Sequence, residues 1–237
     1  MIWNRNITIP RACAVGAVIA AAGLLSACVS TVDGTAIRAQ GTVARSVPLL
    51  DEAELDDILL TIGELNGILG STRMEVTIEL DEMTDHSSTV SDPDCLGAIY
   101  GAEEPMYAGS EWTAVRDQVA REPDDDNDHW VEQTAVLYPA ATDARDFFDR
   151  SASTWEYCAN DSIGVGGGDY LWMLDGVDVG DTMIVQDATQ DDANGWACQH
   201  ALSFVSNLTV EAWACGYSIT DEGVQIASAM IENAADR

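Results

Sequence analysis

The sequence predicts an α+β fold, a single domain with a mainly antiparallel β-sheet, flanking helices and two disulfides. Three observations support this prediction. Runs of alternating polar and apolar residues follow one another through connections that are too short for parallel crossovers. Helical patterns stand at both ends of the predicted domain and once between the strands. The predicted domain has an even set of four cysteines, as expected of two disulfides in an exported protein.

The first elements are two short helices. The ranges 51–60 and 61–69 both have helical patterns. The second begins with a capping box formed by Thr61 and Glu64, and Gly70 follows as its C-terminal cap. We therefore expect helices to precede the first strand.

Several segments have the pattern of strands. They span 73–80, 112–120, 130–138, 170–174, 181–186, 196–205 and 208–216. In the first of them, apolar residues alternate with polar ones, which predicts a strand with one buried face. These apolar residues are Met74, Val76, Ile78 and Leu80.

Two longer helices are expected beside the sheet. One begins after Thr142, which is a suitable N-terminal cap, and runs to Cys158. Its buried face would be formed by Ala144, Phe148, Ala152 and Trp155. The other covers 221–235, and its apolar face would be formed by Val224, Ala227 and Ile231. Because Cys158 continues the face of the first helix, a disulfide there would fix that helix to the domain.

The spacing of the last two cysteines predicts how all four pair. If residues 206–207 form a tight turn, the register of the two flanking strands is fixed. This register places Cys198 opposite Cys215 as a non-hydrogen-bonded pair, with Cα atoms about 4.5 Å apart, a separation that a disulfide tolerates. The remaining pair is Cys95 with Cys158.

The N-terminal residues have the pattern of a bacterial lipoprotein signal. Residues 12–27 carry no charge and follow Arg5 and Arg11, and cleavage before Cys28 would leave a cysteine that carries acyl chains such as palmitate. This run is too short to span a bilayer comfortably. A short membrane helix and an ordinary secretory signal are the alternatives. We expect a signal peptide over 1–27, a flexible tether over 28–48 and the folded domain over 49–237, held by lipid on the extracytoplasmic face of the plasma membrane.

The charge of the chain excludes several partners. Its 41 acidic residues stand against 10 basic ones, all of them arginine, so the formal net charge is −31. A surface of this sign repels nucleic acid and anionic lipid headgroups, because they too are negatively charged. No nucleic-acid partner is therefore expected, and the acidic residues serve first to keep the protein soluble.

Linear motifs for catalysis do not occur in the sequence. It contains no G-x-S-x-G, Walker or H-E-x-x-H motif. The glycine-rich run that starts at Gly164 has Asp169 where a dinucleotide motif needs its third glycine, which predicts a loop. We therefore predict neither an enzyme nor a cofactor.

An acidic segment over 123–129 is the best candidate for a metal site, because clustered carboxylates suit calcium. It departs from the EF-hand pattern, since His129 stands in place of the required glycine and Ala135 in place of the closing glutamate. The alternative is a solvated hairpin loop, and we predict no metal site.

Histidines and tryptophans are the remaining candidate site residues. The three histidines are His86, His129 and His200. In the predicted hairpin His200 faces Trp213, either as a structural residue or as a catalytic base for which no nucleophile can be named. The tryptophans belong either to the core or to a ligand cleft, and those considered for a cleft are Trp155, Trp172, Trp196 and Trp213.

Five short strings occur in the order found in a known family. They are 91–97 (SDPDCLG), 107–112 (YAGSEW), 131–139 (VEQTAVLYP), 196–199 (WACQ) and 214–217 (ACGY). Together with the four cysteines, they resemble the PknH-like extracellular sensor domain family of mycobacteria, in its stand-alone lipoprotein form. The resemblance implies a single α+β domain with an antiparallel sheet, disulfides that join the first cysteine to the second and the third to the fourth, and a large cleft for an unknown ligand.

The family also occurs as the outer domain of receptor serine/threonine kinases. The chain shows neither a kinase domain nor a transmembrane helix, so we expect any sensor role to pass through a partner. The leading hypothesis is a non-enzymatic, lipid-anchored ligand-binding module of the mycobacterial cell envelope, in which Arg73 or Arg116 could seat an anion. The alternatives are a protein-interaction accessory of envelope signalling, which binds or competes for kinase ectodomains, and an unrecognised hydrolase.

Overall fold

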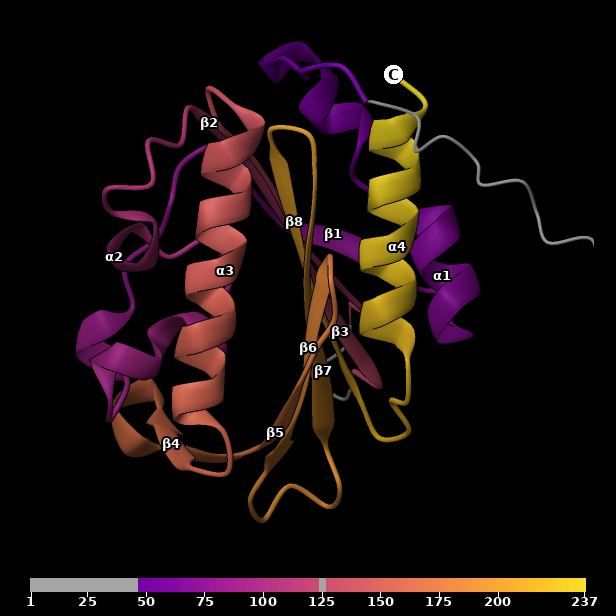
Figure 1. Ribbon diagram of the computed structural model, residues 1–237. Helices are drawn as coiled ribbons and strands as arrows, with labels where there is room; N and C mark the ends of the chain where they lie inside the picture. The colour runs from indigo at the N-terminus through magenta and orange to yellow at the C-terminus, as the bar shows by residue number, and fades with distance from the viewer. Residues whose placement is uncertain (1–46, 124–126) are drawn as a thin grey trace, which may run out of the picture. The chain divides into compact units, whose positions relative to one another are not determined.

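The computed structural model describes residues 47–123 and 127–237 (Figure 1). The predicted signal peptide, the lipidation site Cys28 and nearly all of the predicted tether lie outside the described residues, so they stay predictions. In the described part, no helix combines the length and the apolar character needed to cross a bilayer.

Eight strands form one sheet in the order β1-β2-β3-β8-β7-β6-β5-β4, and all neighbouring strands are antiparallel. Their bounds are β1 Glu75–Leu80, β2 Ala114–Arg121, β3 His129–Leu137, β4 Ser162–Val165, β5 Tyr170–Val179, β6 Met183–Gln190, β7 Ala197–Val205 and β8 Leu208–Gly216. The predicted fold class is confirmed.

Helices cover both faces of this sheet (Figure 1). The α-helices are α1 Ile62–Leu69, α2 Glu104–Tyr107, α3 Ala141–Cys158 and α4 Glu222–Ala235, and the longer 3-10 helices are η1 Glu52–Asp57 and η3 Pro93–Ala98. In Figure 1, α3 lies against one face, and α4 with α1 lies against the other. We call these the α3 face and the α4 face.

The two faces bury different kinds of side chain. The core on the α3 face is rich in aromatic residues and contains both disulfides. The core on the α4 face consists mainly of alanine, leucine and other aliphatic residues. Small side chains allow α4 to approach the sheet closely, and a Cβ placed on Gly223 would lie 2.6 Å from the carbonyl oxygen of Gln199 on β7. Gly223 is therefore needed at this contact.

The predicted hairpin has the predicted register. Cys198 lies opposite Cys215 and His200 opposite Trp213. The turn depends on Ser206, whose φ of 51° lies in the left-handed region. Asn207 accepts a hydrogen bond from the Leu50 amide and donates to its carbonyl oxygen, so it joins the turn to the first described residues.

Both disulfides form as predicted. Cys198 is bonded to Cys215 across the hairpin, with a Cα–Cα distance of 4.0 Å. Cys95 in η3 is bonded to Cys158 at the end of α3. The second bond holds the long helix to the segment that precedes β2.

Helix boundaries differ from the predictions at two places. The first predicted helix, 51–60, is the shorter 3-10 helix η1. The predicted cap Thr142 lies inside α3, because the helix begins earlier, with Ala140 as its cap. There the Ala140 amide donates to the carboxylate of Asp143 at 3.1 Å, an interaction that replaces the expected threonine cap.

The buried faces of α4 and β1 also differ from the predicted ones. In α4 the most buried side chains include Ile226 and Met230, whereas Val224 and Ile231 lie partly exposed at the margin. In β1, Ile78 is 47% exposed, because the strand is at the sheet edge and its register with β2 shifts between Val76 and Ile78.

The region around the glycine-rich run contains a strand that was not predicted. Residues 162–165 form β4, which pairs with the start of β5, so Gly164 is in a strand. Where a loop was expected, only residues 166–169 separate the two strands, and the first three of them form the short 3-10 helix η4 Gly166–Gly168. The next two strands are longer than predicted, at 170–179 and 183–190.

Candidate functional site

An aromatic cleft of about 450 Å³ opens on the α3 face of the sheet. It is lined by Ile99, Tyr100, Arg121, Asn127, Trp130, Glu132, Val165, Tyr170, Trp172, Gln190, Trp196, Cys198, Trp213 and Cys215. Six of these side chains are aromatic rings, contributed by several strands and by the segment after η3. A wall of this kind offers flat apolar surfaces with a few polar groups between them.

Strand register brings the lining residues together. On β3, Trp130 lies opposite Cys215 and Glu132 opposite Trp213 of β8. Since alternate residues of a strand point to the same face, these side chains share the α3 face. Trp172 of β5 pairs with the last residue of β6 in the same way.

A second depression, which we call the outer hollow, continues the aromatic cleft. It has a volume of about 440 Å³ and shares four lining residues with the cleft. Those that it adds are Ala193, Asn194 and Tyr217. Together the two depressions form an elongated site that extends over the β6–β7 connection.

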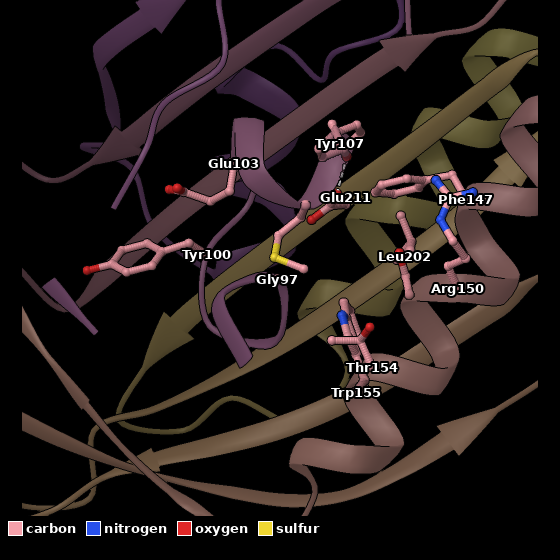
Figure 2. Close-up of a pocket in the computed structure, with 12 residues that line it drawn as sticks. Gly97, Tyr100, Glu103, Tyr107, Phe147, Arg150, Thr154, Trp155, Leu202 and Glu211 are labelled. Carbon is pink, nitrogen blue, oxygen red and sulfur yellow. Dashed lines mark hydrogen bonds between the residues drawn. The ribbon is translucent and has the colours of Figure 1, made fainter. Parts of the chain in front are cut away.

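A smaller inner cavity of about 170 Å³ lies between α3 and residues 97–107 (Figure 2). Figure 2 shows Arg150 and Trp155 of α3 on one side and Tyr100 and Glu103 on the other. Tyr100 lines both this cavity and the aromatic cleft. The two spaces are therefore neighbours on the same face of the sheet.

The inner cavity contains two buried carboxyl groups with fixed partners. Glu103 accepts hydrogen bonds from the His86 amide at 2.7 Å and from Thr84, and lies 2.5 Å from His86 Nδ1. Glu211 accepts a hydrogen bond from the Tyr107 hydroxyl (Figure 2). Burial and the nearby Glu211 carboxylate raise the pKa of Tyr107 well above its usual value, so this phenol stays protonated as the donor.

His200 is enclosed between two indole rings. Its ring centroid lies 3.9 Å from that of Trp155 and 4.1 Å from that of Trp213. Nε2 lies 3.2 Å from the Glu211 carboxylate, and Nδ1 has no hydrogen-bond partner among the described residues. Burial lowers the pKa of His200, so the ring is neutral, and we assign its proton to Nε2, where Glu211 can accept it.

Asp117, which is buried, and Glu132, which is partly exposed and lines the aromatic cleft, form a second pair of carboxyl groups. Burial raises the pKa of Asp117 to about 6, although hydrogen bonds from Thr134, at 2.6 Å, and from Glu132 act to lower it. Burial and the neighbouring Asp117 carboxylate raise the pKa of Glu132 well above its usual value. Near pH 7 the pair therefore holds one proton, which is on Glu132 and is donated to Asp117.

Comparison with known proteins identifies the domain. The model of the PknH-like extracellular domain family matches residues 50–233. The chain belongs to this family. A crystal structure of the extracellular domain of PknH from Mycobacterium tuberculosis superposes with a TM-score of 0.76 and 34% identity, over 81% of this chain and 100% of that one.

Two curated relatives match this PknH-like domain with the same identity over the same number of residues. The serine/threonine-protein kinases PknH of Mycobacterium bovis and Mycobacterium tuberculosis are each 37% identical over 183 residues, or 76% of this chain. The chain spans 31% and 29% of their respective lengths. What is shared is therefore an extracellular, sensor-like domain, related to the outer domain of a kinase.

The structure places the tryptophan candidates of this PknH-like domain in two neighbouring spaces. Trp172, Trp196 and Trp213 line the aromatic cleft, and Trp155 lines the inner cavity. Trp130 was not among the predicted cleft residues, although its position two residues before Glu132 in a predicted strand places both on one face. The inner carboxyl groups were missed because their proximity depends on the strand order.

The histidines do not form a hydrolytic site among the described residues. Each lies beside a glutamate, at Glu103, Glu122 or Glu211, and no hydrogen bond joins a histidine ring nitrogen to a hydroxyl or thiol in that part of the chain. His200 is fully buried, and its contacts are those of the structural alternative.

Neither the metal nor the anion candidates gained support. Residues 124–126 of the acidic loop lie outside the described residues, and the remainder of the described chain contains no cluster suited to a metal ion. Arg116 bonds to Asp56 at 2.8 Å and to Glu52 at 3.4 Å, so its charge is already matched. Arg121, rather than Arg73 or Arg116, lines the aromatic cleft.

Proposed function

We propose that the chain is a non-enzymatic, lipid-anchored binding module on the extracytoplasmic face of the mycobacterial plasma membrane. The aromatic cleft is its ligand site. Membership in a family of extracellular domains supports the location. The predicted lipobox at Cys28 supports the anchor.

The observation that carries this proposal is the exposure of several large rings around a cleft. Trp130, Trp172 and Trp196 are only partly buried, and Tyr170 is 54% exposed. A core would bury such side chains completely, because each has a large apolar area to remove from water. Their convergence around an open space supports binding of a ligand that covers them.

A fluorescence titration with fractionated envelope extract tests the proposal. Full-length protein should respond to at least one fraction with a saturable change in tryptophan emission. The substitutions Trp172→Ala and Trp196→Ala should each weaken this binding at least about tenfold, because indole rings supply most of the contact area. Tyr157→Ala is the matched control, since Tyr157 is 69% exposed and does not line the cleft. Binding that is equally strong in all three variants would contradict the proposal.

A protein partner is the second candidate, and one observation favours it. Leu171 and Met173 on β5 are 41% and 43% exposed, and they alternate with the cleft residues Tyr170 and Trp172, so they face the other side of the strand. Exposed apolar side chains of this kind suit a protein interface. Crosslinking in living cells through a photoreactive residue at position 171 should capture an envelope protein, such as a kinase ectodomain, if this second function exists. Capture that is independent of the position of the crosslinker would contradict it.

A further inference from the structure

The aromatic cleft differs in charge from the remainder of this acidic chain. Glu132 is the one acidic residue among the described residues that line it, and the described lining of the outer hollow has none. A hollow beside β1 and β2 has the opposite character, because its lining includes Asp56, Glu79, Asp81 and Asp117. In a chain with 41 acidic residues, the cleft is therefore poor in acidic groups, and Arg121 adds one positive charge to its described lining.

Glu132 does not bring a negative charge into the cleft. Its carboxyl group donates to Asp117, and the backbone at Gly101 lies so close that an added Cβ would be 3.2 Å from Glu132 Oε1. Burial raises its pKa well above the usual value, so the group is protonated near pH 7. A neutral carboxyl group both donates and accepts hydrogen bonds.

Most of the other polar groups of the site have the same dual character, whereas Arg121 can only donate. Asn127 and Gln190 line the cleft, and Asn194 lines the outer hollow. Each side-chain amide can donate and accept, as can the Tyr170 hydroxyl. In addition, Trp213 lines the cleft while 4% exposed, and its indole N–H has no partner among the described residues. Such an unsatisfied donor calls for an acceptor.

Hydroxyl groups match this set of partners, because a hydroxyl also donates and accepts. A sugar ring adds a flat face of C–H groups that packs on an indole or phenol ring, while its hydroxyls remain free at the rim. From these observations we infer that the aromatic cleft and the outer hollow bind a neutral oligosaccharide. The inference rests on the proposed function and names the chemical class of its ligand. Two contiguous spaces of about 450 and 440 Å³ suit a chain of sugars rather than a single ring.

Charged ligands fit the site less well. An anion would meet Arg121 but would also approach a protein with a net charge of −31. A cation would find aromatic faces but no ionised carboxylate among the described lining residues. A neutral polar ligand avoids both difficulties.

Binding to immobilised oligosaccharides tests the inference. The probes are neutral hexasaccharides of glucose, mannose, galactose and arabinose, together with a β-1,4-linked glucosamine hexamer and a β-1,4-linked glucuronic acid hexamer. The full-length protein, extracted in a sugar-free zwitterionic detergent, is expected to bind at least one neutral probe with a Kd below about 1 mM near pH 7. The cationic and anionic hexamers should bind at least about tenfold more weakly.

Variants relate the binding to the site. Trp172→Ala and the surface variant Tyr170→Ala should each weaken binding of the neutral probe at least about tenfold, and Tyr157→Ala should leave it unchanged. Glu132→Gln should retain binding within about threefold, because an amide reproduces the donor and acceptor of a protonated carboxyl group. Loss of binding in Glu132→Gln, with the fold intact by near-ultraviolet circular dichroism, would show that an ionised carboxylate is used and would overturn the inference.

The outcomes separate this inference from the proposed function. Failure of every neutral probe, or preference for a charged one, overturns the oligosaccharide inference. If an envelope fraction free of sugar still binds in a manner that depends on Trp172, the cleft remains a ligand site of another class. If binding of that fraction is also independent of Trp172, the proposed function fails as well.

Discussion

At the scale of single residues, the energetics of this domain depend on buried acids with specific partners. Asp117 is 4% exposed, and its carboxyl group contacts Thr134 and Glu132. Glu122 is 2% exposed, and its carboxyl group contacts His129 and Ser71. The first environment raises a pKa and the second lowers one, so the two acids should affect stability in opposite directions as pH changes.

Asp117 should destabilise the fold as pH rises. Burial raises its pKa to about 6, above the value of about 3.9 for an unfolded aspartate. The folded state then binds more protons than the unfolded state between these values, so its contribution to stability falls as pH rises from about 4 to 6. The free energy of unfolding of Asp117→Asn, taken relative to that of wild type, should therefore rise by on the order of 2 kcal/mol from about pH 4 to pH 7.

Urea denaturation at both pH values measures this gain. Asp181→Asn is the control, since Asp181 is an exposed residue next to β6. If the free energy of unfolding of Asp117→Asn differs from that of wild type by the same amount at both pH values, the Asp117 carboxyl group has no raised pKa in the folded protein.

Glu122 should stabilise the fold at neutral pH. Burial acts to raise its pKa, but hydrogen bonds from the His129 ring, from Ser71 at 2.8 Å and from the His129 amide at 2.9 Å lower it to about 2. This contribution is complete above the unfolded value of about 4.3 and is lost as pH falls to about 2. Glu122→Gln should therefore lower the free energy of unfolding near pH 7 by on the order of 2 kcal/mol.

The difference between wild type and Glu122→Gln should shrink as the pH falls from about 4 to 2. Chemical denaturation across this range gives the measurement. An equal difference throughout would mean that packing, and not the charge of Glu122, accounts for the loss.

At the scale of elements, the contact between α4 and β7 gives a direct test of packing. A Cβ at Gly223 would lie 2.6 Å from a backbone oxygen of Gln199, so α4 would have to move. Gly223→Ala should lower the free energy of unfolding by about 2 kcal/mol or more. Gly67→Ala is the matched control in α1, because a Cβ there meets no atom within 4 Å. It should raise stability by about 0.5 to 1 kcal/mol. Thermal denaturation of both variants gives the comparison, and equal effects would contradict this account.

The two disulfides should contribute unequally. They join residues separated by 63 positions for Cys95–Cys158 and by 17 positions for Cys198–Cys215. The entropy of loop closure then predicts losses of about 4 and 3 kcal/mol when each pair is replaced by alanine. Guanidinium denaturation of the two double variants measures these losses, and a larger loss from the hairpin pair would contradict the entropic explanation.

Local patterns predicted the elements better than their boundaries. The β7–β8 register could be predicted because a two-residue turn fixes every cross-strand pair, which placed Cys198 opposite Cys215. The start of α3 could not be predicted in this way. The helix begins after Ala140 rather than after Thr142 because the Asp143 side chain accepts a hydrogen bond from the Ala140 amide. Which residues of α4 are buried likewise depends on the close contact of Gly223 with the sheet.

The candidate site was only partly predictable for a similar reason. Its tryptophans were visible as a class of residue, and the resemblance to the family implied a cleft. The strand order β3-β8-β7-β6-β5, which brings Trp130 and Trp172 to one space, has no signature in local sequence. The neutral state of Glu132 depends on its contact with Asp117, and therefore also on the fold.

At the scale of the whole molecule, a negatively charged domain presents to a ligand an aromatic cleft whose described lining has no ionised acidic group near pH 7. The acidic residues repel anions, while the described lining of the cleft contains Arg121 and a protonated Glu132 and no ionised acid. The family relation to a kinase outer domain connects this architecture to sensing.

Native mass spectrometry of the full-length protein, purified from its own envelope, tests this claim most directly. The account predicts an additional mass on the wild-type protein that disappears on denaturation and is absent from a variant carrying both Trp172→Ala and Trp196→Ala. The value of that mass would identify the ligand. An additional mass that is retained in the folded double variant, or a wild-type protein that never carries one even after incubation with envelope extract, would contradict it.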